Sequence, residues 1–89
     1  MRYAAKADAN QSEIIAALEA VGASVFPSFR LGGGFPDLVV GFRGVTYLLE
    51  VKTPTGRLTP AEARFFARWR GHAAVVHDAE EALRAIGAI

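Results

Sequence analysis

The residues that decide the fold read PDLVVGFRGVTYLLEVK, from Pro36 to Lys52. Two runs rich in β-branched and aromatic residues, 37–42 and 45–52, flank Arg43-Gly44, a pair that suits the two-residue turn of a β-hairpin. Both runs are apolar on both faces, which is typical of strands in the middle of a sheet. The stretch therefore predicts a central antiparallel hairpin.

The turn determines which residues of the hairpin face each other. With a two-residue loop, Asp37 lies opposite Glu50, and Lys52 shares their face because side chains alternate along a strand. Directly opposed like charges destabilise a sheet, so we expect a cation between the two carboxylates. Lys52 is one such cation, and two carboxylates beside a backbone carbonyl also suit Mg²⁺. The alternative is an aspartate in a turn after Pro36 and a solvent-exposed Glu50–Lys52 pair.

Upstream of the hairpin, the sequence predicts one helix and one short strand. Residues 10–13, Asn-Gln-Ser-Glu, have the form of a capping box, and the helix is expected over 11–21. The strand is expected over 25–29, and Pro27 confines it to an edge of the sheet because proline cannot donate to a strand ladder.

Downstream of the hairpin, residues 59–62, Thr-Pro-Ala-Glu, form a second capping box, which starts a helix over 60–70. A strand over 73–77 and a helix capped by Asp78 complete the chain. The order α-β-β-β-α-β-α predicts an α/β fold with a small mixed sheet flanked by helices.

Composition and charge narrow the class of protein. The chain has 89 residues, no cysteine and a net charge of +1, so we expect one domain over 1–89, with 1–10 a loosely ordered arm, in the cytoplasm. No apolar run approaches the roughly 20 residues of a membrane span, and the N-terminus does not resemble a signal peptide. Residues 30–70 carry +4, whereas 1–29 and 71–89 carry −1 and −2, so an anionic partner should meet the middle of the chain.

Three motifs carry a family resemblance: Gly34-Phe35-Pro36-Asp37, Glu50-Val51-Lys52, and the Gly-Arg-Leu-Thr-Pro-x-Glu helix start at 56–62. Together they resemble the virus-type replication-repair nuclease (VRR-NUC) domain of the PD-(D/E)XK nuclease superfamily, over roughly residues 11–83. The resemblance implies a restriction-endonuclease-like core and Mg²⁺-dependent hydrolysis of phosphodiester bonds in DNA, with Mn²⁺ as a substitute. Short members of this family resemble Holliday junction resolvases and typically come from bacteriophages, whereas longer relatives are DNA-repair proteins.

The resemblance also assigns roles to residues. It implies that Asp37 and Glu50 are metal ligands, that Val51 is a ligand through its backbone carbonyl, and that Lys52 is the catalytic lysine. Glu13 corresponds to a helix glutamate that completes many such sites, although its place in a capping box also explains it. Many relatives have glutamine where this chain has Glu62; capping explains Glu62, which therefore stays outside the predicted site.

The predicted DNA contacts are glycines that let a backbone come close and arginines that suit phosphates: Gly32, Gly33, Gly34, Arg57, Arg64 and Arg68. A flexible turn and a solvated basic face are the alternative explanations. The apolar spacing of Phe65, Phe66 and Trp69 favours a core or a subunit interface over stacking on bases.

The expected function is a structure-selective DNA endonuclease that resembles a Holliday junction resolvase. A four-way junction is two-fold symmetric and is cut on two strands, so we expect a homodimer. A flap nuclease or an exonuclease would use the same site. The alternatives from other classes are a non-catalytic DNA-binding or assembly module on the nuclease fold and an unrelated small α/β interaction protein.

Overall fold

The central hairpin forms as predicted in the computed structural model, which describes residues 9–89. Strand β2 (Leu38–Phe42) pairs antiparallel with β3 (Val45–Val51) in the register that a two-residue turn requires. The turn residues Arg43 and Gly44 have φ angles of 52° and 81°. Positive φ at both positions matches the twist of the flanking strands, which is why this turn is favoured in hairpins.

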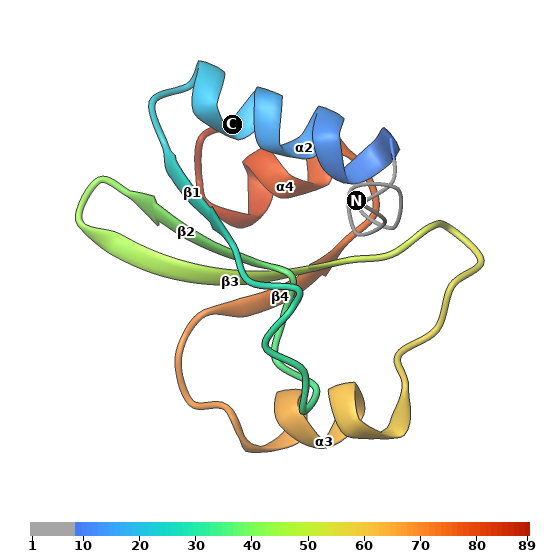
Figure 1. Cartoon of the computed structure of the whole chain (residues 1–89). Helices are drawn as coiled ribbons and strands as arrows, with labels where there is room; N and C mark the ends of the chain where they lie inside the picture. Colours follow the sequence, from blue (N-terminus) through green and yellow to red (C-terminus); the bar gives the residue numbers. More distant parts are fainter. Residues whose placement is uncertain (1–8) are drawn as a thin grey trace.

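Two outer strands complete a four-stranded sheet in the order β1-β2-β3-β4 (Figure 1). β1 (Ser24–Pro27) pairs antiparallel with β2 at one edge, where Pro27 placed it, but it ends two residues earlier than predicted. β4 (Ala73–Val76) pairs parallel with β3 after a crossover through helix α3 (Pro60–Arg68). The predicted element order and the small mixed sheet are therefore confirmed.

One face of the sheet carries the main core. Helices α2 (Ala9–Ala20) and α4 (Ala79–Ala85) lie side by side over this face, and α3 stands on the opposite side (Figure 1). Ile14 and Leu18 of α2 are fully buried, as are Leu38 and Val40 of β2, because alternate residues of the strand point to the same face. No helix within residues 9–89 is both long and apolar enough to cross a membrane.

The start of α2 corrects two predictions. The helix already includes Ala9 and Asn10, so Asn10 does not cap it and the loosely ordered arm does not extend over residues 9–10; residues 1–8 lie outside the described part of the chain. The Asn10 side chain instead donates a 3.4 Å hydrogen bond to the carbonyl of His77. The capping pattern predicted a start that is too late, because it reports only a local preference. Alanine has the highest helix propensity, and the helix already includes Ala9.

Helix α3 begins as predicted but is not a core helix. Thr59 Oγ1 accepts a hydrogen bond from the N–H of Glu62, and Glu62 Oε1 accepts one from the N–H of Thr59, which completes the capping box. The helix ends at Arg68, with Trp69 as its C-cap, and none of its residues is buried. Phe65 and Phe66 are half-buried and Trp69 is exposed, so the core, one of the two predicted roles of these aromatic residues, is not formed; the subunit interface stays a prediction.

The loop over residues 31–35, called the glycine loop here, contacts the first turn of α3. A Cβ on Gly34 would lie 2.3 Å from the carbonyl oxygen of Ala61, so only glycine allows this approach, and its φ of 85° also favours glycine. The next residue, Phe35, meets the ring of Phe65 edge-on at 5.4 Å between centroids. The segment that leads into β2 is therefore attached to α3, and the two approach the same end of the hairpin.

Candidate active site

The end of the hairpin brings together the three charged residues that the sequence placed on one face. Asp37 immediately precedes β2, Glu50 lies in β3 and Lys52 immediately follows β3. Lys52 Nζ lies 3.5 Å from Glu50 Oε2, and Asp37 Oδ2 accepts a 2.9 Å hydrogen bond from the N–H of Val51. Two carboxylates and one ammonium therefore share one small region at the strand ends.

Glu62, which the sequence does not predict as a site residue, is the fourth charged residue of this cluster. Its Oε1 lies 2.8 Å from Lys52 Nζ, and the same oxygen accepts the capping hydrogen bond from Thr59 at 2.8 Å. Glu62 therefore has two roles, since it caps α3 and also holds the lysine. The sequence held one signal for the second role, because the family resemblance implies a glutamine at this position, and the glutamine side chain could also make both contacts.

Glu50 is the most deeply buried acid of the cluster, with 2% of its surface exposed. Burial, followed by the negative charges of Asp37 and Glu62, raises the pKa of Glu50 to about 8. Its Oε1 is buried and has no hydrogen-bond donor among residues 9–89. A buried acceptor without a donor is costly, so this oxygen favours either a proton or a cation beside it.

The other three groups divide into two kinds. Burial is the main reason that the pKa of Asp37 is raised, against the opposing hydrogen bond from Val51. Burial is the largest single influence on Glu62 and Lys52, and it acts to raise the pKa of Glu62 and to lower that of Lys52. The hydrogen bonds and opposite charges around each group together outweigh it, so the Glu62 pKa falls and the Lys52 pKa rises. Lys52 and Glu62 therefore stay charged as a pair, and Asp37 and Glu50 are the groups that favour a proton or a cation.

This donor set fits a hard divalent cation held by two carboxylates. Within the described range 9–89, no three acidic or histidine side chains are arranged around one metal position. Mg²⁺ needs only one or two carboxylates, because it keeps several of its waters. The uncompensated Oε1 of Glu50 beside Asp37 is the observation that supports this fit.

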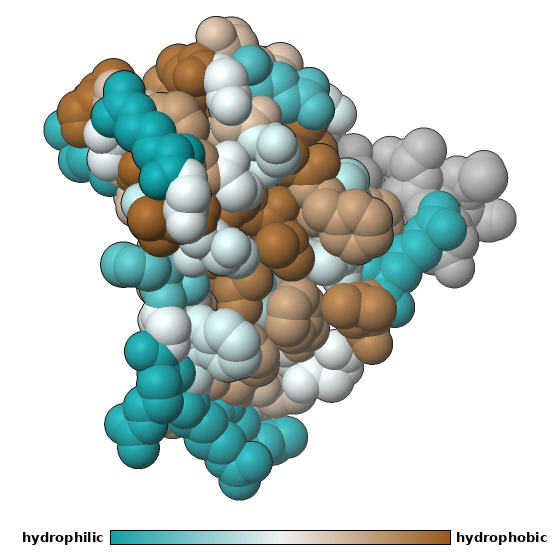
Figure 2. Space-filling model, turned by 90° about the vertical axis from the view of Figure 1, so that its left-hand side faces the viewer, coloured by the Kyte–Doolittle hydropathy of each residue, from teal (hydrophilic) through white to brown (hydrophobic). Residues whose placement is uncertain are grey.

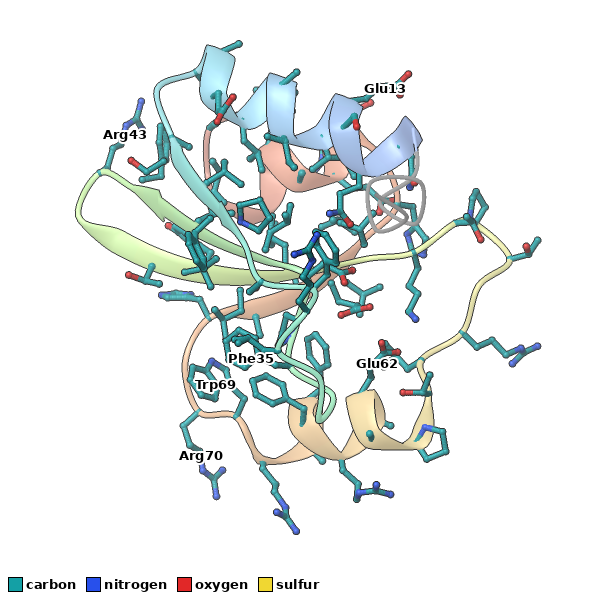
Figure 3. All side chains as sticks on the ribbon, viewed as in Figure 1. Glu13, Phe35, Arg43, Glu62, Trp69 and Arg70 are labelled. Carbon is teal, nitrogen blue, oxygen red and sulfur yellow. The ribbon has the colours of Figure 1, made fainter. Side chains whose placement is uncertain are left out.

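Glu13 is not part of the cluster. It is exposed on α2, and Figure 3 shows its side chain pointing away from the body of the molecule, on the opposite side from Glu62. The expectation that Glu13 completes the site is therefore corrected, because the helix turns this position toward solvent. Val51 contributes its N–H to Asp37, and a ligand role for its carbonyl stays a prediction.

The predicted DNA contacts lie around α3 rather than at the carboxylates. Gly33, Arg64 and Arg68 line a cavity between the glycine loop and α3. Arg57 is exposed in the segment between β3 and α3, and Gly32 is exposed in the glycine loop. Gly34 contacts the α3 backbone, so it positions the loop and does not offer open space to a ligand.

The PD-(D/E)XK class of nuclease fold is defined by two features that this structure has. One is a buried acidic pair with a lysine at the end of an antiparallel hairpin, and the other is a helical crossover from that hairpin to a parallel strand. No protein-family model matches the sequence, and no curated protein matches it either. Among solved structures, a chain described as "VRR_NUC domain" is similar to this one, with a TM-score of 0.71 and 29% sequence identity over 85% of this chain and 88% of that chain. The fold and this likeness support a VRR-NUC domain, which is a nuclease domain.

Proposed function

We propose that this domain is a Mg²⁺-dependent deoxyribonuclease that hydrolyses phosphodiester bonds in branched DNA, as a homodimer that resembles a Holliday junction resolvase. The observation that carries the proposal is the pairing of Asp37 with the buried Glu50, whose Oε1 lacks a donor within residues 9–89, next to the ammonium of Lys52. Mn²⁺ should replace Mg²⁺, because the ligands are oxygen atoms of carboxylates.

Each residue of the cluster has a separate role in the proposed hydrolysis. A bound Mg²⁺ would polarise the phosphate and lower the pKa of a water molecule, and Asp37 and Glu50 are the residues that would hold it. The Val51 N–H fixes the orientation of the Asp37 carboxylate. Lys52, kept protonated by Glu62 at 2.8 Å, stabilises negative charge that develops on the phosphate, a contribution of roughly 3 kcal/mol in comparable sites.

Charge supports DNA as the substrate. Residues 30–70 carry a net +4 in a chain with a net charge of +1 overall. Figure 2 shows strongly hydrophilic side chains at the end of the molecule that α3 forms, and Arg64 and Arg68 are exposed on this helix. Arginines on one surface suit phosphate contacts, which hold DNA without reading its sequence. Structure-selective cleavage is therefore favoured over sequence-specific cleavage.

Cleavage of labelled four-way junction, 5′-flap and linear duplex DNA tests the proposal. We expect paired symmetric nicks in the junction with Mg²⁺ or Mn²⁺, and loss of cleavage in Asp37→Asn and Lys52→Gln. Glu13→Gln is the matched control, because this glutamate is exposed away from the cluster, and it should cleave like the wild type.

The other outcomes separate the alternatives. Cleavage of flaps or ends would retain the chemistry and change the substrate. If folded protein is stabilised by Mg²⁺ and binds DNA but cuts nothing, the non-catalytic module is correct. If neither metal stabilises the fold, the metal site itself is wrong.

A further inference from the structure

A cavity of about 240 Å³ lies between the glycine loop and α3, and none of the four charged residues of the cluster lines it. Its lining consists of Gly33, Ala61, Arg64, Phe65, Arg68 and Trp69. This volume is a little below the roughly 300 Å³ at which pockets for drug-sized ligands begin. The cavity therefore suits one planar ring rather than a large ligand.

The aromatic wall of this cavity is held in place. The indole of Trp69 stacks on the ring of Phe65, with 5.1 Å between centroids and 20° between planes, and Phe35 braces Phe65 from the glycine loop. Gly71 lies so close to the indole that a Cβ there would be 2.9 Å from Nε1. Trp69 is nevertheless 43% exposed. A fixed and still accessible indole loses little conformational freedom when another ring stacks on it.

The cationic wall consists of Arg64 and Arg68, one helical turn apart. Like charges at this spacing repel each other, and neither guanidinium forms an ion pair within residues 9–89. Glu62, on the same helix, is already occupied by Lys52. The two arginines therefore favour an anionic ligand, and cations beside an aromatic platform are the combination that binds single-stranded nucleic acid through its phosphates and its bases.

We propose that Trp69, flanked by Arg64 and Arg68, binds one unpaired DNA base near the phosphate that is cut. Figure 3 shows Trp69 and Glu62 at opposite ends of α3. Seven residues at 1.5 Å each separate them by about 10 Å along the helix, which is the length of about three stacked nucleotides. The domain would therefore select DNA that is unpaired within a few nucleotides of the cut, as at a branch point. The inference takes DNA as the substrate from the proposed function, but it does not require hydrolysis.

Fluorescence offers a direct test, because Trp69 is the single tryptophan of the chain. The full chain is titrated in EDTA with oligothymidine, with the same oligonucleotide carrying abasic sites, and with blunt duplex DNA. We expect oligothymidine to quench the indole emission and the abasic strand and the duplex to quench it far less. Equal quenching by the abasic strand, or binding of oligothymidine without any quenching, would overturn the inference.

Variants make the test quantitative. Trp69→Leu should weaken oligothymidine binding about 5- to 150-fold, as expected for the loss of one stacked base, and should leave the affinity for the abasic strand unchanged. Trp69→Phe should lie between Trp69→Leu and the wild type, and it also controls for disturbed folding. Phe66→Leu is the matched control, since Phe66 lies on the same helix but does not line the cavity. Wild-type affinity of Trp69→Leu for oligothymidine contradicts the base site.

The outcomes distinguish this inference from the proposed nuclease activity. Base-dependent quenching in a protein that cuts no DNA supports the base site and rejects the nuclease proposal. Junction cleavage by the wild type, with unchanged binding and cleavage by Trp69→Leu, supports the nuclease and rejects the base site. Failure to bind any of the three DNAs in EDTA rejects the base site, whatever the cleavage assay shows.

Discussion

Glu50 makes the stability of the metal-free domain depend on pH. Its pKa is about 8 in the folded chain against an ordinary 4.5, so between these values the folded state binds a proton that the unfolded state has released. The stability that Glu50 contributes should therefore be fully present below about pH 4.5 and should be lost as the pH rises through about 8. Each unit of pKa difference corresponds to about 1.4 kcal/mol, so the slope is measurable by urea unfolding in EDTA.

The matched variant for this measurement is Glu50→Gln, which keeps the shape of the side chain and removes its charge. Its free energy of unfolding should vary much less between about pH 5 and 8 and should exceed that of the wild type at the upper end. An unchanged slope in Glu50→Gln would place the titrating group elsewhere.

Glu62 should tolerate one substitution and not another. Glutamine keeps a side chain that can cap α3 and accept a hydrogen bond from Lys52, so Glu62→Gln should fold and cleave nearly as well as the wild type. Alanine removes both contacts, so Glu62→Ala should lose about 1 kcal/mol of stability and about tenfold in cleavage rate. The measurements are thermal unfolding and single-turnover cleavage. If the two variants cleave equally well, Glu62 is only a helix cap.

The contrast between Glu50 and Glu62 shows how much of the site the sequence contains. Asp37, Glu50 and Lys52 follow from the two-residue turn, because strand parity then decides which side chains share a face. Glu62 reaches the same cluster from another element, so its second role depends on where α3 stands relative to the sheet. Glu13 was misplaced for the same reason, since a helix can present a given position to the site or to solvent.

At the scale of elements, the glycine loop and α3 form one unit. Gly34→Ala would add a Cβ 2.3 Å from the carbonyl oxygen of Ala61, so it should push the loop off α3 in addition to straining a φ of 85°. We expect a loss of roughly 2–4 kcal/mol, from the strain and from the clash together, and reduced cleavage. Gly32→Ala is the control, because its φ of 73° carries the same strain but nothing lies within 4 Å of the added Cβ.

Chemical denaturation of the two glycine variants separates these effects. The expected result is that Gly32→Ala loses only the roughly 1–2 kcal/mol of the left-handed conformation. Equal losses in both variants would mean that contact between the loop and α3 contributes nothing.

The elements themselves were more predictable from the sequence than their packing. Arg43-Gly44 and the Thr59 capping box encode their turn and helix start locally, and both form as predicted. The apolar stripe of α3 predicts a core or a subunit interface, and Trp69, at its end, is 43% exposed. A stripe of this kind shows that a helix has one apolar face, but the partner of that face is decided by the rest of the chain.

For the whole molecule, the proposed homodimer predicts a particle of twice the 9.5 kDa chain mass. Phe26 on the edge strand β1 is 66% exposed and Leu31, shortly after it, is 67% exposed, so this edge offers both unpaired backbone groups and apolar surface. Sedimentation of the wild type should show a dimer, and Phe26→Glu should shift it to a monomer. Arg57→Glu, also at an exposed position, should still sediment as a dimer.

A monomeric wild type that still makes paired nicks in junction DNA would contradict the dimer. A dimer that persists in Phe26→Glu would move the interface away from β1.

Because none of the residues of α3 is fully buried, the helix can detach from the sheet by local unfolding at temperatures well below those at which the sheet unfolds. Each such opening would separate Glu62 from Lys52 and the glycine loop from its support, while the core beneath α2 and α4 stays closed. Heat should therefore inactivate the domain below its melting temperature. Substitutions that strengthen the contacts of α3 should therefore raise the temperature at which activity is lost. Substitutions that further stabilise the well-packed hairpin should change this temperature little.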